Sequence, residues 1–252
     1  PIPSDTPTPS PTDTPAPTPT PDPRLLEGVT VIPFDEFRSE IAGENLRYRV
    51  YVPPCYLESQ KRYPYAVLLH GLRQDENEWE TIGVIEALEQ GMRLGAIGPM
   101  ILVMPYTGQI GAADRFFPDP SVEQVILEEL LPAIERDFCT WNDREHRAIG
   151  GISRGGFWAY SIAMRHPDIF GRVGGHSAEL NAESAPNAVS PLALASNDAF
   201  LPNADLSMYL DNASADPAGV SLELFSSRLS ARGIPHDYTI YPTCVHDDDY
   251  WS

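Results

Sequence analysis

The chain has 252 residues, 42% of them hydrophobic, which is enough for one well-packed domain and too few for two enzymes side by side. Its 17 basic residues against 36 acidic ones give a formal net charge of −19. A surface of this sign repels phosphate backbones and anionic lipid headgroups. Because the sequence also lacks an apolar run of about 18 residues, we expect neither a nucleic-acid partner nor a membrane span.

The cysteines and the lysine content argue against two other kinds of site. Cys55, Cys139 and Cys244 are far apart, and none has the Cys or His spacing that a zinc site needs. The chain contains a single lysine, Lys61, in a loop-like stretch, so Schiff-base chemistry is not expected. The sequence therefore predicts neither a structural metal nor a cofactor held by a lysine.

The N-terminal segment differs in composition from the rest of the chain. Residues 1–23 hold 10 of the 26 prolines in a Thr-Pro alternation, with almost no apolar side chains to bury. We interpret residues 1–24 as a disordered linker that could span on the order of 70 Å as polyproline II, at about 3.1 Å per residue. Such spacers are typical of exported proteins, so we expect a secreted or surface-anchored protein with a fused or anchoring module before the linker. The catalytic domain is then 25–252.

From residue 25 onward, strand-like segments alternate with amphipathic helices, which indicates an α/β fold with a mostly parallel sheet covered by helices on both faces. The first two segments should form a hairpin-like pair. The eight expected strands are 29–37, 46–53, 65–71, 100–107, 146–153, 171–178, 206–212 and 236–242. The expected helices are near 77–90, 120–138, 154–166 and 218–232. Residues 179–205 are too long for a simple connection and are predicted to form a loop over the site.

The most informative motif is G-x-S-x-G at residues 151–155, placed directly after an apolar strand and directly before a helix. A serine at this junction lies on a turn so sharp that flanking residues must be glycines, here Gly151 and Gly155. Its hydroxyl then projects above the sheet near the positive end of the helix. This context predicts the α/β-hydrolase fold with Ser153 as the nucleophile.

Hydrolysis of an ester also needs hydrogen-bond donors for the oxyanion of the tetrahedral intermediate. In this topology one donor is the backbone N–H after the nucleophile, which belongs to Arg154. The other comes from the loop after the third strand, where His70-Gly71-Leu72 occurs. We expect Leu72 N–H to be the second donor, with Gly71 allowing close approach and His70 in a structural role.

The order of triad residues in this fold is nucleophile, acid, histidine, so the general base must follow Ser153. Of the four later histidines, His246 alone follows the last strand at the edge where Ser153 lies; the others are His166, His176 and His236. The acid should follow the strand at 206–212, where Asp216 and Asp211 compete. Asp216 is preferred because it is deeper in the loop.

The predicted topology also bears on the cysteines. Cys55 follows the antiparallel second strand and Cys139 ends the helix before the nucleophile strand, so both should lie at the edge opposite the site. We hypothesise a disulfide between them.

With these residues assigned, the domain from about Arg47 onward resembles the esterase D-like family, which includes feruloyl and acetyl-xylan esterases and enterochelin esterase-like proteins. The landmarks are YRVYVPPCY, YPYAVLLHG with the following Asn77 to Trp79, DREHRAIGGISRGGFWAY and HDYTIYPTCVHDDDYW. The resemblance implies a triad of Ser153, Asp216 and His246 and no cofactor. Two features depart from the family: residues 243–245 replace a small-residue pair before the histidine, and only six residues follow His246 where a closing helix is usual.

The expected activity is that of a secreted serine carboxylic ester hydrolase acting on carbohydrate-linked acyl esters, such as feruloyl or acetyl groups of plant polysaccharide. Candidate aromatic walls of the substrate site are Trp79, Phe116, Phe117 and Trp251, with core packing as the alternative for each. The competing functions are a siderophore esterase, an acyltransferase and a non-catalytic binding module of the same fold.

Overall fold

The computed structural model describes residues 28–31, 37–113, 115–116, 118–181, 185–197, 205–242 and 245–251. The predicted linker, together with Phe117 and Cys244, lies outside these residues. Within them, no helix combines the length and the apolar character that crossing a bilayer requires.

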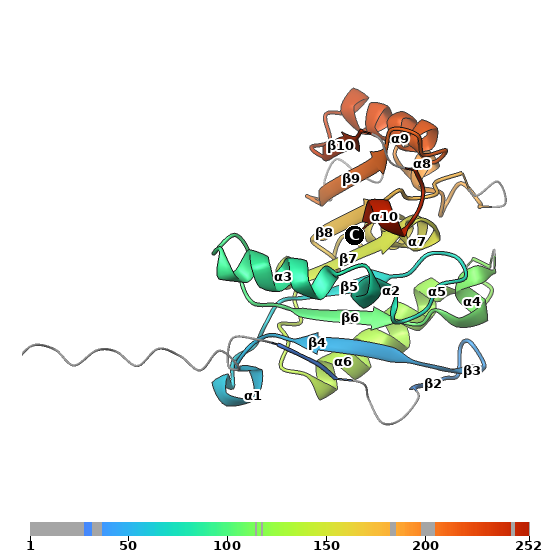
Figure 1. The fold of residues 1–252 in the computed structure, drawn as a ribbon. Coiled ribbons are helices and arrows are strands. Elements are labelled where there is room, and N and C mark those ends of the chain that lie inside the picture. The colour runs from blue at the N-terminus through green and yellow to red at the C-terminus, as the bar shows by residue number, and fades with distance from the viewer. Residues whose placement is uncertain are drawn as a thin grey trace, which may run out of the picture.

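An eight-stranded sheet forms the centre of the molecule, in the order β1-β4-β6-β5-β7-β8-β9-β10 (Figure 1). Its strands are β1 (Val29–Val31), β4 (Tyr48–Val52), β5 (Tyr65–Leu69), β6 (Ile101–Pro105), β7 (Arg147–Ile152), β8 (Arg172–His176), β9 (Ser207–Ala213) and β10 (Asp237–Tyr241). β4 runs antiparallel to both β1 and β6, whereas the remaining neighbours pair in parallel. All eight predicted strands are therefore present, and the first two pair as expected.

The chain between β1 and β4 forms a separate two-stranded hairpin that was not predicted. Its strands, β2 (Phe37–Ser39) and β3 (Glu44–Leu46), pair only with each other. The hairpin is tied to a helical stretch, because Glu129 accepts hydrogen bonds from Ser39 Oγ and from the backbone N–H groups of Glu40 and Ile41. A three-residue strand held by such a distant side chain carries little signal of its own in the sequence.

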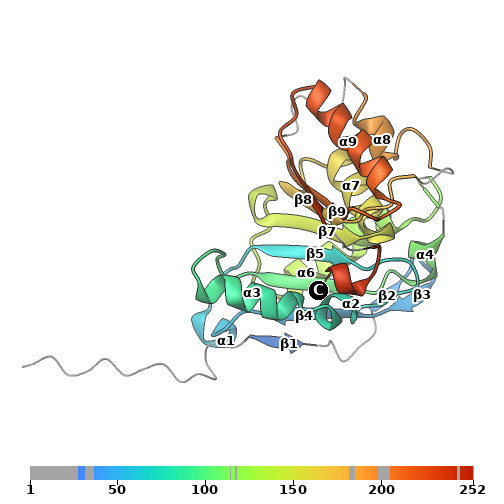
Figure 2. The same ribbon diagram turned by 45° about the horizontal axis from the view of Figure 1, so that its top comes forward.

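Helices cover both faces of the sheet, as predicted, but they are more interrupted than their sequence patterns indicated (Figures 1 and 2). The elements are α1 (Tyr56–Ser59), α2 (Glu78–Thr81), α3 (Val84–Arg93), α4 (Gly108–Ala112), α5 (Val122–Gln124), a π-helical stretch (Val125–Leu130), α6 (Leu131–Asp137), a 3-10 turn (Arg144–His146), α7 (Arg154–Arg165), α8 (Pro191–Leu194), α9 (Gly219–Ala231) and α10 (Asp248–Trp251). The predicted helix at 77–90 is split into α2 and α3 by Gly83, whose φ of 88° cannot belong to a helix.

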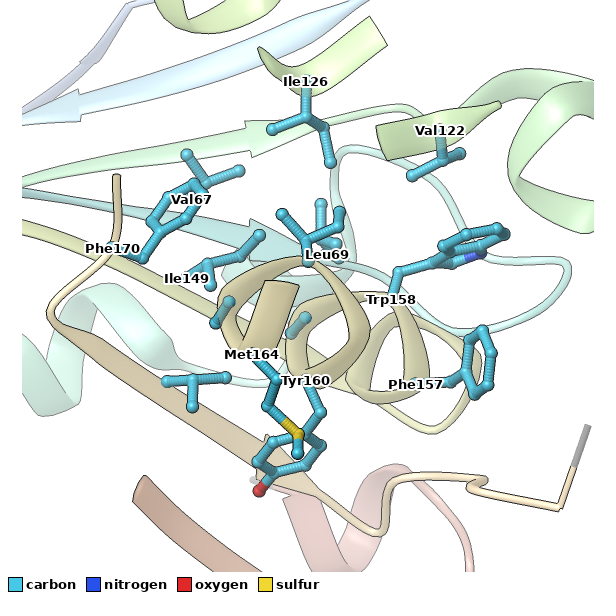
Figure 3. Packing of buried hydrophobic residues seen from close by; sticks show 14 of the residues in the cluster. Val67, Leu69, Val122, Ile126, Ile149, Phe157, Trp158, Tyr160, Met164 and Phe170 are labelled. Carbon is cyan, nitrogen blue, oxygen red and sulfur yellow. The ribbon is translucent and has the colours of Figure 1, made fainter. Parts of the chain in front are cut away.

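The hydrophobic core lies on both faces of the sheet. The larger cluster packs helices α5, α6, α7 and α9 against one face, and Figure 3 shows four of its members on α7 (Phe157, Trp158, Tyr160 and Met164) together with Val67, Leu69 and Ile149 of the strands. The smaller cluster joins Trp79 of α2 and Leu88 of α3 to the other face. Because α7 is buried along almost its whole length, it is a rigid support for the residue that precedes it.

The segment 179–205 was predicted to be a loop over the site, and its described parts correct that view. Residues 185–197 contain the short helix α8, and Leu180, Val189 and Leu194 are buried in the larger cluster. Ser161 of α7 donates a hydrogen bond to the Val189 carbonyl, which ties this part of the segment to the core. Among the described residues of this segment, Glu179 and Asn181 line a pocket together with Asp216 and His246.

The hypothesis of a disulfide between Cys55 and Cys139 is wrong in this structure, where no such bond forms and both residues are exposed. The predicted proximity is nevertheless present, since the Tyr56 hydroxyl accepts a hydrogen bond from Cys139 N–H at 2.8 Å. The phenol of Tyr56, rather than a sulfur–sulfur bond, connects these two segments.

Candidate active site

Ser153 lies on the sharp turn between β7 and α7. Its φ of 50° and ψ of −115° form a backbone conformation that residues with side chains rarely adopt. A Cβ on Gly151 would lie 2.2 Å from the backbone carbon of Gly155, and one on Gly155 would lie 2.3 Å from the Leu69 carbonyl oxygen. The two glycines are therefore needed for the turn, as the motif predicted.

Backbone hydrogen bonds hold this turn in place. Ser153 N–H donates to the His176 carbonyl at 3.0 Å, and Glu179 N–H donates to the Ser153 carbonyl at 3.0 Å. The strained residue is thus fixed to the end of the neighbouring strand β8 and to the residues that follow it. Rigid support of this kind is what maintains a costly backbone conformation.

Three predicted residues from separate parts of the chain form one hydrogen-bonded series. The Ser153 Oγ lies 2.8 Å from His246 Nε2, and His246 Nδ1 lies 3.0 Å from both carboxylate oxygens of Asp216. An ionised Asp216 can only accept, so Nδ1–H donates to it, and Nε2 accepts the serine proton. This is the arrangement in which an imidazole can act as a general base toward a hydroxyl.

Asp216 is buried, and its environment favours the charged form. Burial by itself would raise the pKa of the carboxyl, but hydrogen bonds led by the one from His246 outweigh it and lower the pKa below its ordinary value. Ala218 N–H also donates to Oδ1 at 2.7 Å. Asp216 therefore remains ionised at neutral pH and can stabilise an imidazolium at His246.

The loop after β5 approaches the serine closely. A Cβ on Gly71 would lie 3.5 Å from the Ser153 Cβ. The Gly71 carbonyl accepts hydrogen bonds from His70 Nδ1 at 2.7 Å and from Gln74 N–H at 3.3 Å. Since the Gly71 carbonyl and the Leu72 N–H belong to one planar trans peptide, fixing the carbonyl also fixes the opposite direction of the N–H.

The tautomer of His70 follows from its partners. Burial lowers the pKa of this imidazole, so the ring is neutral at neutral pH. The backbone N–H of Thr107 is an obligatory donor and lies 3.0 Å from Nε2, which must therefore accept. The remaining ring proton is on Nδ1 and is donated to Gly71, so the predicted structural role of His70 has a defined geometry.

Arg154 is the first residue of α7, where backbone N–H groups point out of the amino end of the helix. Its guanidinium stacks over the rings of Phe157 and Trp158, with centroid distances of 5.0 and 5.3 Å. The side chain is thus held against the helix, and the backbone N–H lies next to Ser153. The structure therefore places both predicted oxyanion donors, Leu72 and Arg154, in segments that adjoin the serine.

Two pockets are lined by residues of the candidate site, and we name each by the predicted site residues in its lining. The oxyanion-side pocket, of about 150 Å³, is lined by residues that include Leu72, Tyr106, Arg154 and Trp158. The histidine-side pocket, of about 340 Å³, is lined by His246 and Asp216 together with Glu179, Asn181, Pro217, Ala218 and Ser221. The lining of the second pocket is rich in groups that can bind hydroxyls.

Three of the four candidate aromatic residues lie in the described part of the chain, and they differ in their surroundings. Trp79 is buried in the smaller core cluster, and Phe116 packs against Phe157 and Trp158 in the larger one. For these two, core packing is the better interpretation. Trp251 is partly buried, and its ring meets the His246 ring edge-on at 5.0 Å, so among the three candidates that the structure describes it is the one in contact with the candidate site.

The remaining histidines have partners elsewhere. His166 contacts Glu123 at the end of α7, and His236 contacts Ser226 and the Ile234 carbonyl. These two are outside the candidate site, as the sequence indicated.

Sequence reasoning missed a second pair of a carboxylate and a histidine. The His176 Nδ1 lies 2.8 Å from one oxygen of the Asp211 carboxylate, and Tyr250 OH donates to the other oxygen at 2.7 Å. Asp211 is only 1% exposed. The signal that could have revealed the pair is the strand register, since both residues are near the ends of adjacent parallel strands and face each other directly.

Metal-binding residues are not gathered anywhere in the described part of the chain, which contains no group of three or more His, Cys, Asp or Glu side chains arranged to hold an ion.

Solved structures of esterases share this architecture. A ferulic acid esterase superposes with a TM-score of 0.77 at 23% identity, over 90% of this chain and 93% of that one. An S-formylglutathione hydrolase from Agrobacterium tumefaciens gives a TM-score of 0.72 at 18% identity, over 90% of this chain and 91% of that one. Likeness at this level of identity shows the fold, which is that of the α/β-hydrolases.

Curated relatives are similar over about half of the chain. An endo-1,4-beta-xylanase/feruloyl esterase of Xylanibacter ruminicola is 33% identical over 147 residues, which are 55% of this chain and 20% of that protein. An esterase of Mycobacterium tuberculosis is 31% identical over 147 residues, which are 56% of this chain and 31% of that protein. The chain thus spans less than a third of the length of these relatives.

The family model described as "Putative esterase" matches residues 39–252. Because this match covers most of the chain, the protein belongs to the family that this model describes.

Proposed function

We propose that this chain is a serine esterase that transfers an acyl group first to Ser153 and then to water. The observation that carries the proposal is the series of hydrogen bonds from Ser153 through His246 to the ionised Asp216. A serine hydroxyl is a weak nucleophile on its own, and an adjacent oriented base is the usual means of activating it.

In the first step, Ser153 Oγ attacks the ester carbonyl while His246 Nε2 takes its proton. The negative charge that develops on the carbonyl oxygen is stabilised by the backbone N–H groups of Leu72 and Arg154. Collapse of this intermediate breaks the bond to the alcohol, which leaves with the proton from His246. Asp216 keeps the imidazole in the required tautomer and stabilises its transient positive charge.

In the second step, water attacks the acyl-serine ester. His246 is again neutral after the alcohol has left with its proton, so it can take a proton from this water. The carboxylic acid is released and Ser153 recovers its hydrogen. The same two N–H groups stabilise the second intermediate.

The chemistry assigns the two pockets to the two halves of the substrate. The departing alcohol must lie within reach of His246 Nε2, so it occupies the histidine-side pocket, whose lining includes Glu179, Asn181 and Ser221. These polar groups suit a sugar hydroxyl. The acyl group extends toward the oxyanion-side pocket, where Tyr106 and Trp158 line the wall and suit an aromatic acid.

We therefore propose carbohydrate-linked acyl esters, feruloyl groups of plant polysaccharide foremost, as the substrate class. Support comes from the pocket linings and from the relative that is named as a feruloyl esterase. A polymeric substrate outside the cell is also consistent with the Thr-Pro segment at residues 1–24, which we propose to be a spacer of an exported protein. Activity in the culture medium of producing cells would support export.

The test is hydrolysis of methyl ferulate and p-nitrophenyl acetate by the wild type and by Ser153→Ala. We expect both esters to be cleaved and the substitution to reduce kcat by about 10⁴-fold or more. Preference for ferulate, measured as kcat/KM, supports the aromatic acyl pocket. Cleavage of acetate alone would reject the feruloyl assignment while leaving the mechanism intact. A wild type that neither cleaves these esters nor reacts with a fluorophosphonate probe would overturn the mechanism.

A further inference from the structure

The C-terminal helix α10 begins two residues after His246 and carries two aromatic residues with different contacts. Trp251 meets the imidazole of His246 edge-on, with ring centroids 5.0 Å apart. Tyr250 points to the sheet and donates its hydroxyl hydrogen to Asp211. Figure 2 shows α10 lying close to α2 beside the sheet, so the helix is a separate short element that must be attached by its side chains.

Asp211 offers α10 a rigid attachment point. It is buried within the parallel strand β9, and its other carboxylate oxygen is occupied by His176 of the adjacent strand β8. A phenol that donates to a buried carboxylate makes a short, charge-assisted hydrogen bond. Burial and the contact with Asp211 also raise the pKa of Tyr250, so its hydroxyl keeps the hydrogen that it donates.

The backbone of this segment transmits the attachment to His246. Tyr250 N–H and Trp251 N–H both donate to the Asp247 carbonyl, and Asp247 is bonded directly to His246 in the chain. On the other side of the histidine, Val245 is 49% exposed and offers little packing. Among the described neighbours in sequence, the residues that anchor the imidazole are therefore those of α10.

We propose that the hydrogen bond between Tyr250 and Asp211 positions the general base: it holds α10 against the sheet, and α10 holds the imidazole in line with Ser153. Tyr250 and Asp211 touch neither the ester nor the reacting atoms, so they are positioning residues. The proposal rests on the proposed function, because it concerns the step in which His246 takes the serine proton. A displacement of about 1 Å at a reacting group can cost on the order of 100-fold in rate.

The first test compares Tyr250→Phe with Tyr241→Phe. Tyr241 is a suitable control because its ring lies 5.9 Å from that of Tyr250, while its hydroxyl is paired with Tyr209 rather than with Asp211. We expect Tyr250→Phe to lower kcat about 5- to 50-fold with KM within about twofold of the wild-type value. Labelling of Ser153 by a fluorophosphonate should slow in the same proportion. Tyr241→Phe should leave all three quantities unchanged.

The second test changes the acceptor. Asp211→Asn keeps an oxygen that can accept from Tyr250, so kcat should remain within about threefold of wild type, whereas Asp211→Ala should be as slow as Tyr250→Phe. The Tyr250→Phe/Asp211→Ala double variant should be no slower than the slower single one, because both changes remove the same contact. Values of kcat are divided by the fraction of sites that titrate with the probe, which separates positioning from loss of folded protein.

The outcomes distinguish this proposal from the function on which it rests. An active wild type, with Tyr250→Phe as fast as Tyr241→Phe, overturns the positioning role and leaves the esterase mechanism standing. Additive losses in the double variant would also overturn it. Should Tyr250→Phe fail to fold, the contrast between Asp211→Asn and Asp211→Ala decides, and equal rates for these two would reject the proposal. A wild type that is unreactive toward esters and probe overturns both.

Discussion

The two pairs of an aspartate and a histidine at the end of the sheet are alike in local geometry and different in position. Asp216 contacts His246 Nδ1 at 3.0 Å, and Asp211 contacts His176 Nδ1 at 2.8 Å. The second nitrogen of His246 reaches Ser153, whereas the His176 ring lies beside those of Trp79 and Tyr209. A buried carboxylate on an imidazole is therefore not in itself the mark of a general base; what lies at the other ring nitrogen decides the role.

The largest expected effect separates the two acids. Asp216→Asn should lower kcat by about 10³- to 10⁴-fold, because an amide can favour the wrong tautomer of His246 and cannot stabilise the imidazolium. Asp211→Asn should leave kcat within about threefold of the wild-type value. Steady-state kinetics with p-nitrophenyl acetate measure both variants, and thermal unfolding verifies that each is folded. An equal loss of kcat in the two variants would mean that both Asp–His pairs contribute to general-base catalysis.

A second large effect concerns the turn that places the Ser153 hydroxyl against the imidazole of His246. Gly155→Ala puts a methyl group 2.3 Å from the Leu69 carbonyl and 2.5 Å from that of His70, both backbone atoms that cannot move aside easily. We expect a loss of more than about 3 kcal/mol in the free energy of unfolding, or no soluble protein. Gly98→Ala is the matched control, since no atom lies within 4 Å of its added Cβ. Denaturant unfolding compares them, and a stable Gly155→Ala protein would contradict the packing described here.

A smaller effect on kcat is expected at His70, which donates a hydrogen bond to the Gly71 carbonyl in the loop after β5. His70→Ala removes the donor to the Gly71 carbonyl, so the Leu72 N–H loses part of its fixed direction. Removing an oxyanion donor outright costs on the order of 10²- to 10³-fold, and loosening one should cost about tenfold in kcat. The control is His236→Ala, which should leave kcat unchanged because the His236 ring contacts Ser226 of α9 and no described residue of the candidate site. A wild-type kcat for His70→Ala would show that Gln74 alone orients the peptide.

The smallest effect depends on pH and concerns the attachment of α10 to α2. Burial, the charge of Asp248 and a hydrogen bond with it raise the pKa of Glu78 to about 7, from an ordinary value of 4.5. Below pH 4.5 the Glu78 carboxyl is neutral in both the folded and the unfolded chain, so its ionisation does not lower the free energy of unfolding. Between pH 4.5 and 7 Glu78 ionises in the unfolded chain but stays protonated in the folded one, so the free energy of unfolding falls as the pH rises. Above pH 7 the carboxyl is ionised in both states, and the full loss of stability persists.

Glu78→Gln removes this penalty. We expect its Tm to exceed that of the wild type by about 2–4 °C at pH 8.5 and to match it at pH 4. Glu86→Gln, an exposed change on α3, serves as the control and should match the wild type at both values. A Tm difference that is the same at pH 4 and pH 8.5 would show that the ionisation of Glu78 is not its cause.

The strands were predictable because their apolar runs are long enough to stand out from their surroundings. Ser153, Asp216 and His246 could be chosen because the motif and the chain order leave few candidates, and the structure brings these three into hydrogen-bond contact. The attachment of the β2–β3 hairpin to Glu129 and the bond between Tyr250 and Asp211 could not be predicted in the same way. Each depends on a partner distant in sequence, and a single sequence without an alignment does not reveal such pairings.

The choice among aromatic residues shows the same limit. Nothing in the local sequence distinguishes Trp79 and Phe116, which face the core, from Trp251, which faces His246. The direction of a side chain depends on where its short helix or loop packs, and that is determined by the assembled sheet.

The separation of the two pockets has a consequence for the order of events during turnover. On the proposed mechanism, the alcohol departs through the histidine-side pocket while the acyl group remains attached on the other side of Ser153. The space that the alcohol vacates adjoins His246, and water enters it to complete the cycle. A small alcohol such as glycerol would enter by the same route and compete with water, so the ratio of transesterified to hydrolysed product would report how freely that pocket exchanges its contents.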